Sequence, residues 1–147
     1  MDGIRTPLHL WIVGGLATAW NAIGAYDYLM TRTRNMDYLS SIPGVDANDM
    51  LAWFEAFPGW AQFGWGLGVW AGLGGSLLLL ARSRWAVHAF GVSLAGLAAS
   101  TVWQYVLSSP PPEMSSGAML AMNLAIWAVA IGLLVYALRM RARGVLR

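Results

Sequence analysis

Long apolar segments that alternate with short polar breaks dominate the chain. A helix needs about 20 residues to cross a bilayer, and four segments have that length: residues 8–30, 59–81, 85–107 and 117–138. Pro7 and Pro58 stand just before the first two segments, where a helix tolerates proline. The pattern predicts an all-α integral membrane protein, a single domain over residues 1–147 in which four transmembrane helices form a bundle.

The loop between the first two segments, residues 31–58, carries a helix signal of its own. Met50, Trp53, Phe54 and Phe57 recur at spacings of three and four residues and define one apolar face. Asp46 or Asn48 can cap the start of such a helix. We therefore expect a short amphipathic helix in the first outer loop, which is either a surface connector or a lid over a site.

The composition supports a membrane environment and excludes several chemistries. Hydrophobic residues make up 58% of the chain and charged residues 11%, against about 45–50% and 25% in soluble domains. A chain of 15.9 kDa has too much surface to hide this excess in a soluble globule. The chain contains no cysteine, which excludes disulfides and thiolate-bound metals, and no lysine, which excludes Schiff-base chemistry.

The nine basic residues are all arginines, and their positions predict the orientation. Seven belong to one side of the predicted bundle: Arg5, Arg82, Arg84, Arg139, Arg141, Arg143 and Arg147. Arg32 and Arg34 belong to the other. The positive-inside rule then places both termini in the cytoplasm, including an arginine-rich tail at residues 139–147. Because the arginines flank apolar segments, we interpret them as topology signals and expect no nucleic-acid partner.

A row of small residues runs down the second predicted span at every fourth position: Gly64, Gly68, Gly72 and Ser76. Small residues let helix backbones approach closely in lipid, where expulsion of water does not drive association. We expect this row to pack against other helices of the same chain, with packing against another protein as the alternative. Gly66, on another face, is expected to tolerate a large side chain better.

Polar residues concentrate in the outer halves of the predicted spans. Polar side chains in a membrane turn toward one another or toward a water-filled cavity. The sequence therefore predicts a shared ligand or partner site formed by Trp20, Asn21, Asp27, Tyr28, Arg34, Gln104, Tyr105 and Asn123. Two structural alternatives stay open: Asp27 pairs with Arg32 or Arg34, and Asn21 bonds a neighbouring helix.

No residue pattern indicates catalysis. The spans contain no pair of carboxylates, and no serine lies in a motif with histidine and aspartate. We expect no enzymatic activity, no catalytic residues, no metal and no cofactor. His9 and His88 have similar predicted depths on the first and third spans, so a haem or metal pair is the alternative for these two residues.

The stretches "PLHLWIVGGLATAWNAIGAYDYLMTRTRN", "FPGW" and "GVWAGLGGSLLLLARSRWAVHAF" resemble a family of small four-span bacterial membrane proteins, some of which carry the label "sugar transporter". The resemblance covers roughly residues 7–105. It implies a location in the bacterial inner membrane. It also implies that the candidate functional residues lie at the outer end of the first span. They are Trp20, Asn21, Asp27, Tyr28 and Arg34.

The sequence supports two alternative functions. The small size, the surplus of small-residue faces and the lack of a catalytic constellation favour an accessory or interaction subunit of a larger membrane complex, of respiratory or photosynthetic type. Its partners are then the lipid bilayer and other integral membrane subunits, or further copies of the chain. The alternative is a small transporter or polar-ligand-binding membrane protein whose site faces outward, which the outer polar residues favour.

Overall fold

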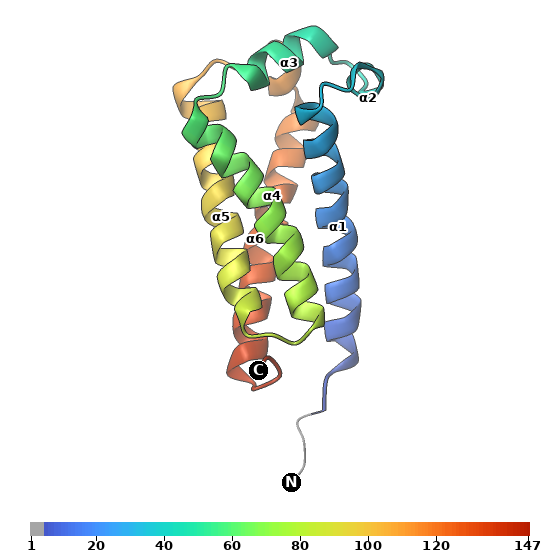
Figure 1. The fold of residues 1–147 in the computed structure, drawn as a ribbon, viewed down its shortest axis with the longest axis vertical. Helices are drawn as coiled ribbons and strands as arrows, with labels where there is room; N and C mark the ends of the chain where they lie inside the picture. Colours follow the sequence, from blue (N-terminus) through green and yellow to red (C-terminus); the bar gives the residue numbers. More distant parts are fainter. Residues whose placement is uncertain (1–4) are drawn as a thin grey trace.

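The computed structural model describes residues 5–147, and all regular secondary structure in that part is helical. Four long helices run side by side (Figure 1) and begin at the residues predicted from the sequence. They are α1 (Leu8–Arg32), α4 (Gly59–Leu80), α5 (Trp85–Val102) and α6 (Gly117–Ala142).

Shorter helices gather at one end of the long ones. They are α2 (Met36–Ser40), α3 (Ala47–Glu55), the π-helix η1 (Trp103–Leu107) and the 3-10 helix η2 (Pro112–Ser115). Figure 1 shows α3 lying across this end. Following the predicted orientation, we call it the outer end and the opposite end the inner end. The amphipathic helix expected in the 31–58 loop is α3, and Asp46 caps it by accepting from the backbone N–H groups of Asn48 and Asp49.

Three helical stretches in the described part of the chain have the length and apolar composition needed to cross a membrane. They are Gly59–Leu80, Trp85–Leu107 and Gly117–Ala142. Length and apolar composition thus make three of the four predicted spans candidates for crossing a membrane. α1 has 25 residues, but His9, Asn21 and Asp27 interrupt its apolar run.

The largest apolar core lies toward the inner end, where all four long helices contribute. It is built from residues such as Leu10, Leu79, Phe90, Leu133 and Ala137. Two smaller cores join the α2–α3 segment to the outer end, one around Leu39, Ala47 and Met50 and one around Trp53, Phe57 and Ala61. The apolar face predicted for α3 is therefore packed onto the long helices.

Helices α4 and α5 approach so closely that a side chain does not fit at their contact. A Cβ atom added to Gly96 would overlap the backbone oxygen of Gly64 and come within 2.5 Å of the backbone nitrogen of Gly68. One turn further in, a Cβ atom on Gly72 would lie 2.7 Å from Oδ1 of Asn21 on α1. The row of small residues on α4 thus packs within the chain, as expected, against two different helices.

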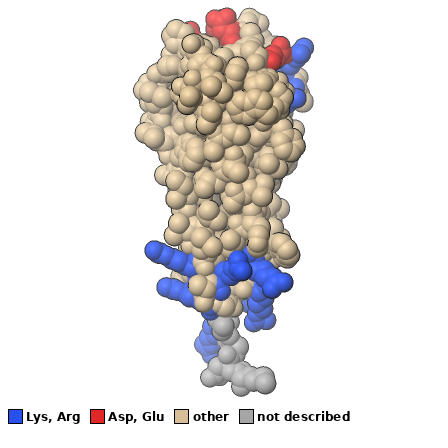
Figure 2. Space-filling model, turned by 90° about the vertical axis from the view of Figure 1, so that its left-hand side faces the viewer, with Lys and Arg blue, Asp and Glu red and all other residues tan. Residues whose placement is uncertain are grey.

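The charged residues separate along the long axis. In the face drawn in Figure 2, arginines gather at the inner end, and acidic residues lie at the outer end with a few arginines beside them. The predicted arginine-rich tail, residues 139–147, begins as the last turn of α6 and ends docked on the bundle. α6 continues to Ala142, Val145 and Leu146 are buried, and the N–H of Arg147 donates to the carbonyl of Arg82 at 2.8 Å.

A turn at the end of α6 causes this docking. Gly144 adopts a left-handed conformation, with φ of 71°, and the N–H of Val145 bonds the carbonyl of Met140 at 3.0 Å. This turn reverses the chain and lays its last residues against the α4–α5 link. The N–H of Arg84 then donates to the carbonyl of Arg147 at 2.8 Å.

Candidate functional site

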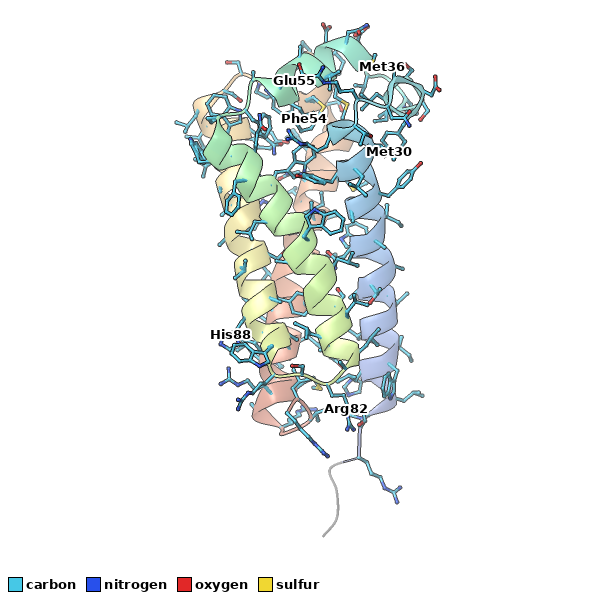
Figure 3. The ribbon with its side chains drawn as sticks, in the orientation of Figure 1. Met30, Met36, Phe54, Glu55, Arg82 and His88 are labelled. Atoms are coloured by element: carbon cyan, nitrogen blue, oxygen red, sulfur yellow. The ribbon has the colours of Figure 1, made fainter. Side chains whose placement is uncertain are left out.

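A polar cleft of about 330 Å³ opens at the outer end between α1, α3 and α4. Its lining consists of Thr31, Arg32, Arg34, Leu51, Phe54, Glu55, Gln62 and Trp65. Figure 3 shows Phe54 and Glu55 on α3, above the end of α1 that carries Met30. Because three helices separated in sequence form its walls, the cleft exists only in the folded chain.

Arg34 enters the cleft from the turn that ends α1. Its backbone is left-handed, with φ of 55°, and the N–H of Asn35 bonds the carbonyl of Met30 at 2.9 Å. The Arg34 guanidinium pairs with the carboxylate of Glu55 on α3 at 2.7 Å. This ion pair connects the end of α1 to the covering helix, although both side chains are largely exposed, which limits its energy to about 1 kcal/mol.

Arg32 is held in place by a neutral partner. Its Nη1 donates to Oε1 of Gln62 at 2.9 Å, and Nε2 of Gln62 donates to the carbonyl of Phe57 at 2.9 Å. Gln62 lies in the first turn of α4, directly after the segment that leads from α3. The amide therefore fixes the position of the guanidinium without neutralising its charge.

The hydroxyl of Thr31 lacks a hydrogen-bond partner although the residue is 2% exposed. Thr18 in α1 and Thr33 just after its end behave differently: their hydroxyls donate to the carbonyl groups four residues earlier, at 2.8 and 2.7 Å. A buried hydroxyl without a partner costs about 1–3 kcal/mol. Thr31 lines the cleft as a residue, but its hydroxyl oxygen has less than 1 Å² of accessible surface and therefore does not face the cleft.

Aromatic rings form the apolar wall of the cleft. Phe54 and Trp65 stack with ring centroids 4.7 Å apart and an angle of 16° between their planes. Tyr28 contacts the other side of this wall, edge-on to Trp65 at 4.8 Å. Its hydroxyl lies 2.7 Å from where a Cβ atom of Gly66 would be, so a side chain at Gly66 has to displace the far end of Tyr28.

Asp27 lies near the cleft but takes part in a different contact. Its Oδ1 accepts from the hydroxyl of Tyr38 on α2 at 2.7 Å, which links α2 to α1. The proposed pairing of Asp27 with Arg32 or Arg34 is therefore wrong, because Gln62 and Glu55 bind those arginines. Burial, followed by the bond to Asp27, raises the pKa of Tyr38 to about 12.

Two of the predicted site residues have other roles. Nδ2 of Asn21 donates to the carbonyl of Ala17 and to Oγ of Ser76, both at 2.9 Å. Ser76 is fully buried and donates in turn to the carbonyl of Gly72 at 3.0 Å. Asn21 thus bonds a neighbouring helix, which was its structural alternative, and Trp20 is 37% exposed on the surface of α1.

The predicted residues of the third and fourth spans form a separate groove. Tyr105 and Asn123 line it together with Thr101, Leu120 and Leu124, and its volume is about 350 Å³. It shares no residue with the cleft. Gln104 is half-buried on η1 but lines neither cavity. The single shared site expected from the sequence is therefore divided in two.

The two histidines have different neighbours. Nδ1 of His9 lies 2.6 Å from the hydroxyl of Tyr136 on α6. His88 lies beside Trp85 at a ring distance of 5.0 Å and points outward from α5 in Figure 3. These contacts do not support a haem or metal pair. Within residues 5–147, no group of three or more His, Cys, Asp or Glu side chains could hold a metal ion.

Sequence reasoning placed one residue, Arg34, in the outer cleft and missed the rest of the lining. A signal was present: "TRTR" ends the first span, Gln62 opens the second, and Glu55 lies on the polar face of the loop helix. What was missing was the position of that loop helix over the end of α1. No family model, curated protein or solved structure matches this chain. The family resemblance noted above therefore remains a prediction.

Proposed function

We propose that the protein is a non-enzymatic, four-span protein of the bacterial inner membrane that binds a small polar ligand in the outer cleft. α1 is the fourth span in this proposal, with both termini in the cytoplasm and the cleft facing outward. The observation that carries the proposal is the guanidinium of Arg32 in the lining of the cleft, which bonds a neutral amide and has no carboxylate within ion-pair distance among residues 5–147. A guanidinium has five N–H donors, so this one retains donors that a polar ligand can use.

The size and lining of the cleft agree with such a role. Ligand sites usually have volumes of about 300–1,000 Å³ and combine an apolar wall with a few converging polar groups. The outer cleft has about 330 Å³, a wall formed by Phe54 and Trp65, and polar groups from all three helices. Whether the ligand is transported or only sensed is a separate question, and binding is the function proposed.

A thermal-shift screen of the purified protein in detergent micelles tests this proposal. The screen uses small anionic, neutral and cationic compounds, and it is repeated with Leu51→Trp, which fills the cleft. Leu77→Trp is the matched control because Leu77 is 52% exposed on α4 and lies outside the cleft. We expect compounds that raise the unfolding temperature of the wild type and of Leu77→Trp but not of Leu51→Trp. A screen without such compounds would contradict the proposal.

A second function, an accessory subunit of a larger membrane complex of respiratory or photosynthetic type, is favoured by a different observation. α6 buries only Leu133, Ala137 and Met140, all in its inner half. Its outer half borders the groove that Asn123 lines. A helix of another integral membrane subunit, or of a second copy, would give the side chain of Asn123 a hydrogen-bond partner.

The evidence for this second function is weaker than the sequence alone suggested. Packing of the small-residue row on α4 against another protein would have supported it, but that row packs against α1 and α5. Affinity purification in mild detergent followed by mass spectrometry tests it. A stoichiometric membrane partner that is lost with Asn123→Leu but kept with Asn21→Leu would support the subunit role, whereas a lone chain would argue against it.

A further inference from the structure

We infer that the ligand of the outer cleft carries a single anionic oxygen group, a carboxylate or a phosphodiester, which binds Arg32. The inference rests on the proposed function, because it names the chemical class of the ligand for the same cleft. Three features carry it: the charge balance of the lining, the hydrogen-bonded position of Arg32, and the aromatic wall of the cleft.

The lining of the cleft carries an excess of positive charge. The lining contains two arginines and one glutamate, and the glutamate is already paired with Arg34 at 2.7 Å. Among residues 5–147, Arg32 has no carboxylate within ion-pair distance, and its bond goes to a neutral amide. One positive charge therefore remains uncompensated in the cleft. This balance favours a ligand with one negative charge over a dianion, which would also face the Glu55 carboxylate.

The position of Arg32 reduces the cost of binding. Arginine has five N–H donors, and the bond to Gln62 uses one of them. Gln62 is itself fixed by its bond to the carbonyl of Phe57. A guanidinium that is already oriented loses less side-chain freedom when it binds, so more of the interaction contributes to affinity. The remaining donors suit the two oxygens of a carboxylate or phosphate.

The stacked rings of Phe54 and Trp65 provide a wall for the apolar part of the ligand. The ligand class is therefore an oxyanion attached to an apolar or planar group.

Such an oxyanion has two sources at the outer surface of a membrane: a soluble organic anion or an anionic lipid headgroup. The probes are benzoate, titrated by calorimetry into the protein in neutral detergent, and phosphatidylglycerol, offered in phosphatidylcholine nanodiscs and detected by native mass spectrometry. Sorbitol is the neutral probe. The variants are Arg32→Gln and Thr31→Val. Arg84→Gln is the control because it removes a positive charge at the inner end.

Benzoate binding supports a soluble ligand, and selective retention of phosphatidylglycerol supports a headgroup. In either case Arg32→Gln should weaken binding about tenfold or more, whereas Thr31→Val should bind as the wild type does, because the Thr31 hydroxyl is buried and does not face the cleft. Arg84→Gln should bind as the wild type does, and unfolding temperatures of all variants confirm that they fold. Sorbitol binding without benzoate or lipid binding would overturn the inference but leave the ligand-binding proposal intact. Failure of all three probes together with an empty thermal-shift screen would overturn both.

Discussion

Two arginines, Arg34 and Arg82, adopt the left-handed conformation with φ near 55°. A residue other than glycine is less stable in this region than in the right-handed helical region by about 1–2 kcal/mol. Both residues end a helix in the same way as Gly144 ends α6, with the following N–H bonded five residues back. Their side chains have contacts that glycine lacks: Arg34 pairs with Glu55, and Arg82 donates to Thr6.

At Arg34 the backbone strain and the ion pair can be separated by mutation. Arg34→Ala and Arg34→Gly both remove the pair with Glu55, but only glycine also removes the clash of Cβ in the left-handed region. We expect Arg34→Gly to be more stable than Arg34→Ala by about 1 kcal/mol, measured by unfolding in detergent micelles. Equal stabilities would show that the turn relaxes when the side chain is lost.

The raised pKa of Tyr38 predicts that the stability of the folded protein depends on pH above pH 10. Its pKa in the folded protein is about 12, against an ordinary value of 10.0, so folding favours the neutral phenol. Below pH 10 both states hold the proton and Tyr38 adds no pH dependence. As the pH rises from 10 to 12 the unfolded state loses the proton first, and stability falls.

The measurement for Tyr38 is the unfolding temperature of the wild type and Tyr38→Phe between pH 8 and pH 12, a window of about two units on either side of the ordinary pKa. We expect a smaller decline above pH 10 in Tyr38→Phe, because the other tyrosines titrate in both proteins. The variant should also be less stable at neutral pH, since Asp27 loses a hydrogen bond. Parallel curves above pH 10 would contradict the assignment.

At the scale of helices, the contact between α4 and α5 depends most on Gly96. A Cβ atom there meets backbone atoms of Gly64 and Gly68, which cannot move aside as a side chain can. Gly96→Ala should therefore destabilise the protein by about 1–3 kcal/mol or more. Unfolding temperature and the fraction of protein that remains monodisperse in detergent measure the effect.

Gly74 is the matched control, because it lies on α4 and a Cβ atom there meets no atom within 4 Å. Gly74→Ala should be neutral or stabilising by up to about 1 kcal/mol, since alanine is the better helix former. Gly66→Ala should lie between the two, because it displaces only the far end of the Tyr28 side chain. If Gly74→Ala and Gly96→Ala had equal effects, close packing of α4 on α5 would not determine stability.

At the scale of the whole molecule, the open prediction is the topology. Figures 1 and 2 place the start of α1, the α4–α5 link and the C-terminus at the arginine-rich end. Fusions after Arg34 and after Arg147 should give opposite signals whether or not α1 crosses, because α4, α5 and α6 lie between them. The decisive pair is a reporter fused ahead of α1 and one fused after Arg34: opposite signals support a spanning α1, whereas the same signal from both would contradict the four-span proposal.

The sequence by itself determined the local features of this protein. The starts of the long helices, the cap and apolar face of α3, and the close-packing row on α4 all followed from residues within a few turns of one another. Apolar length, proline breaks and capping act over such short distances, so their effects can be recognised without the fold.

The tertiary structure alone decided which polar residues meet. Asn21 and Ser76 are 55 positions apart, and Arg32 and Gln62 are 30 positions apart. Their contacts depend on how far each helix is rotated about its axis and on where α3 lies over the outer end. Packing between distant segments sets both, and depth along a helix does not specify them. For this reason the predicted polar cluster separated into a cleft and a groove.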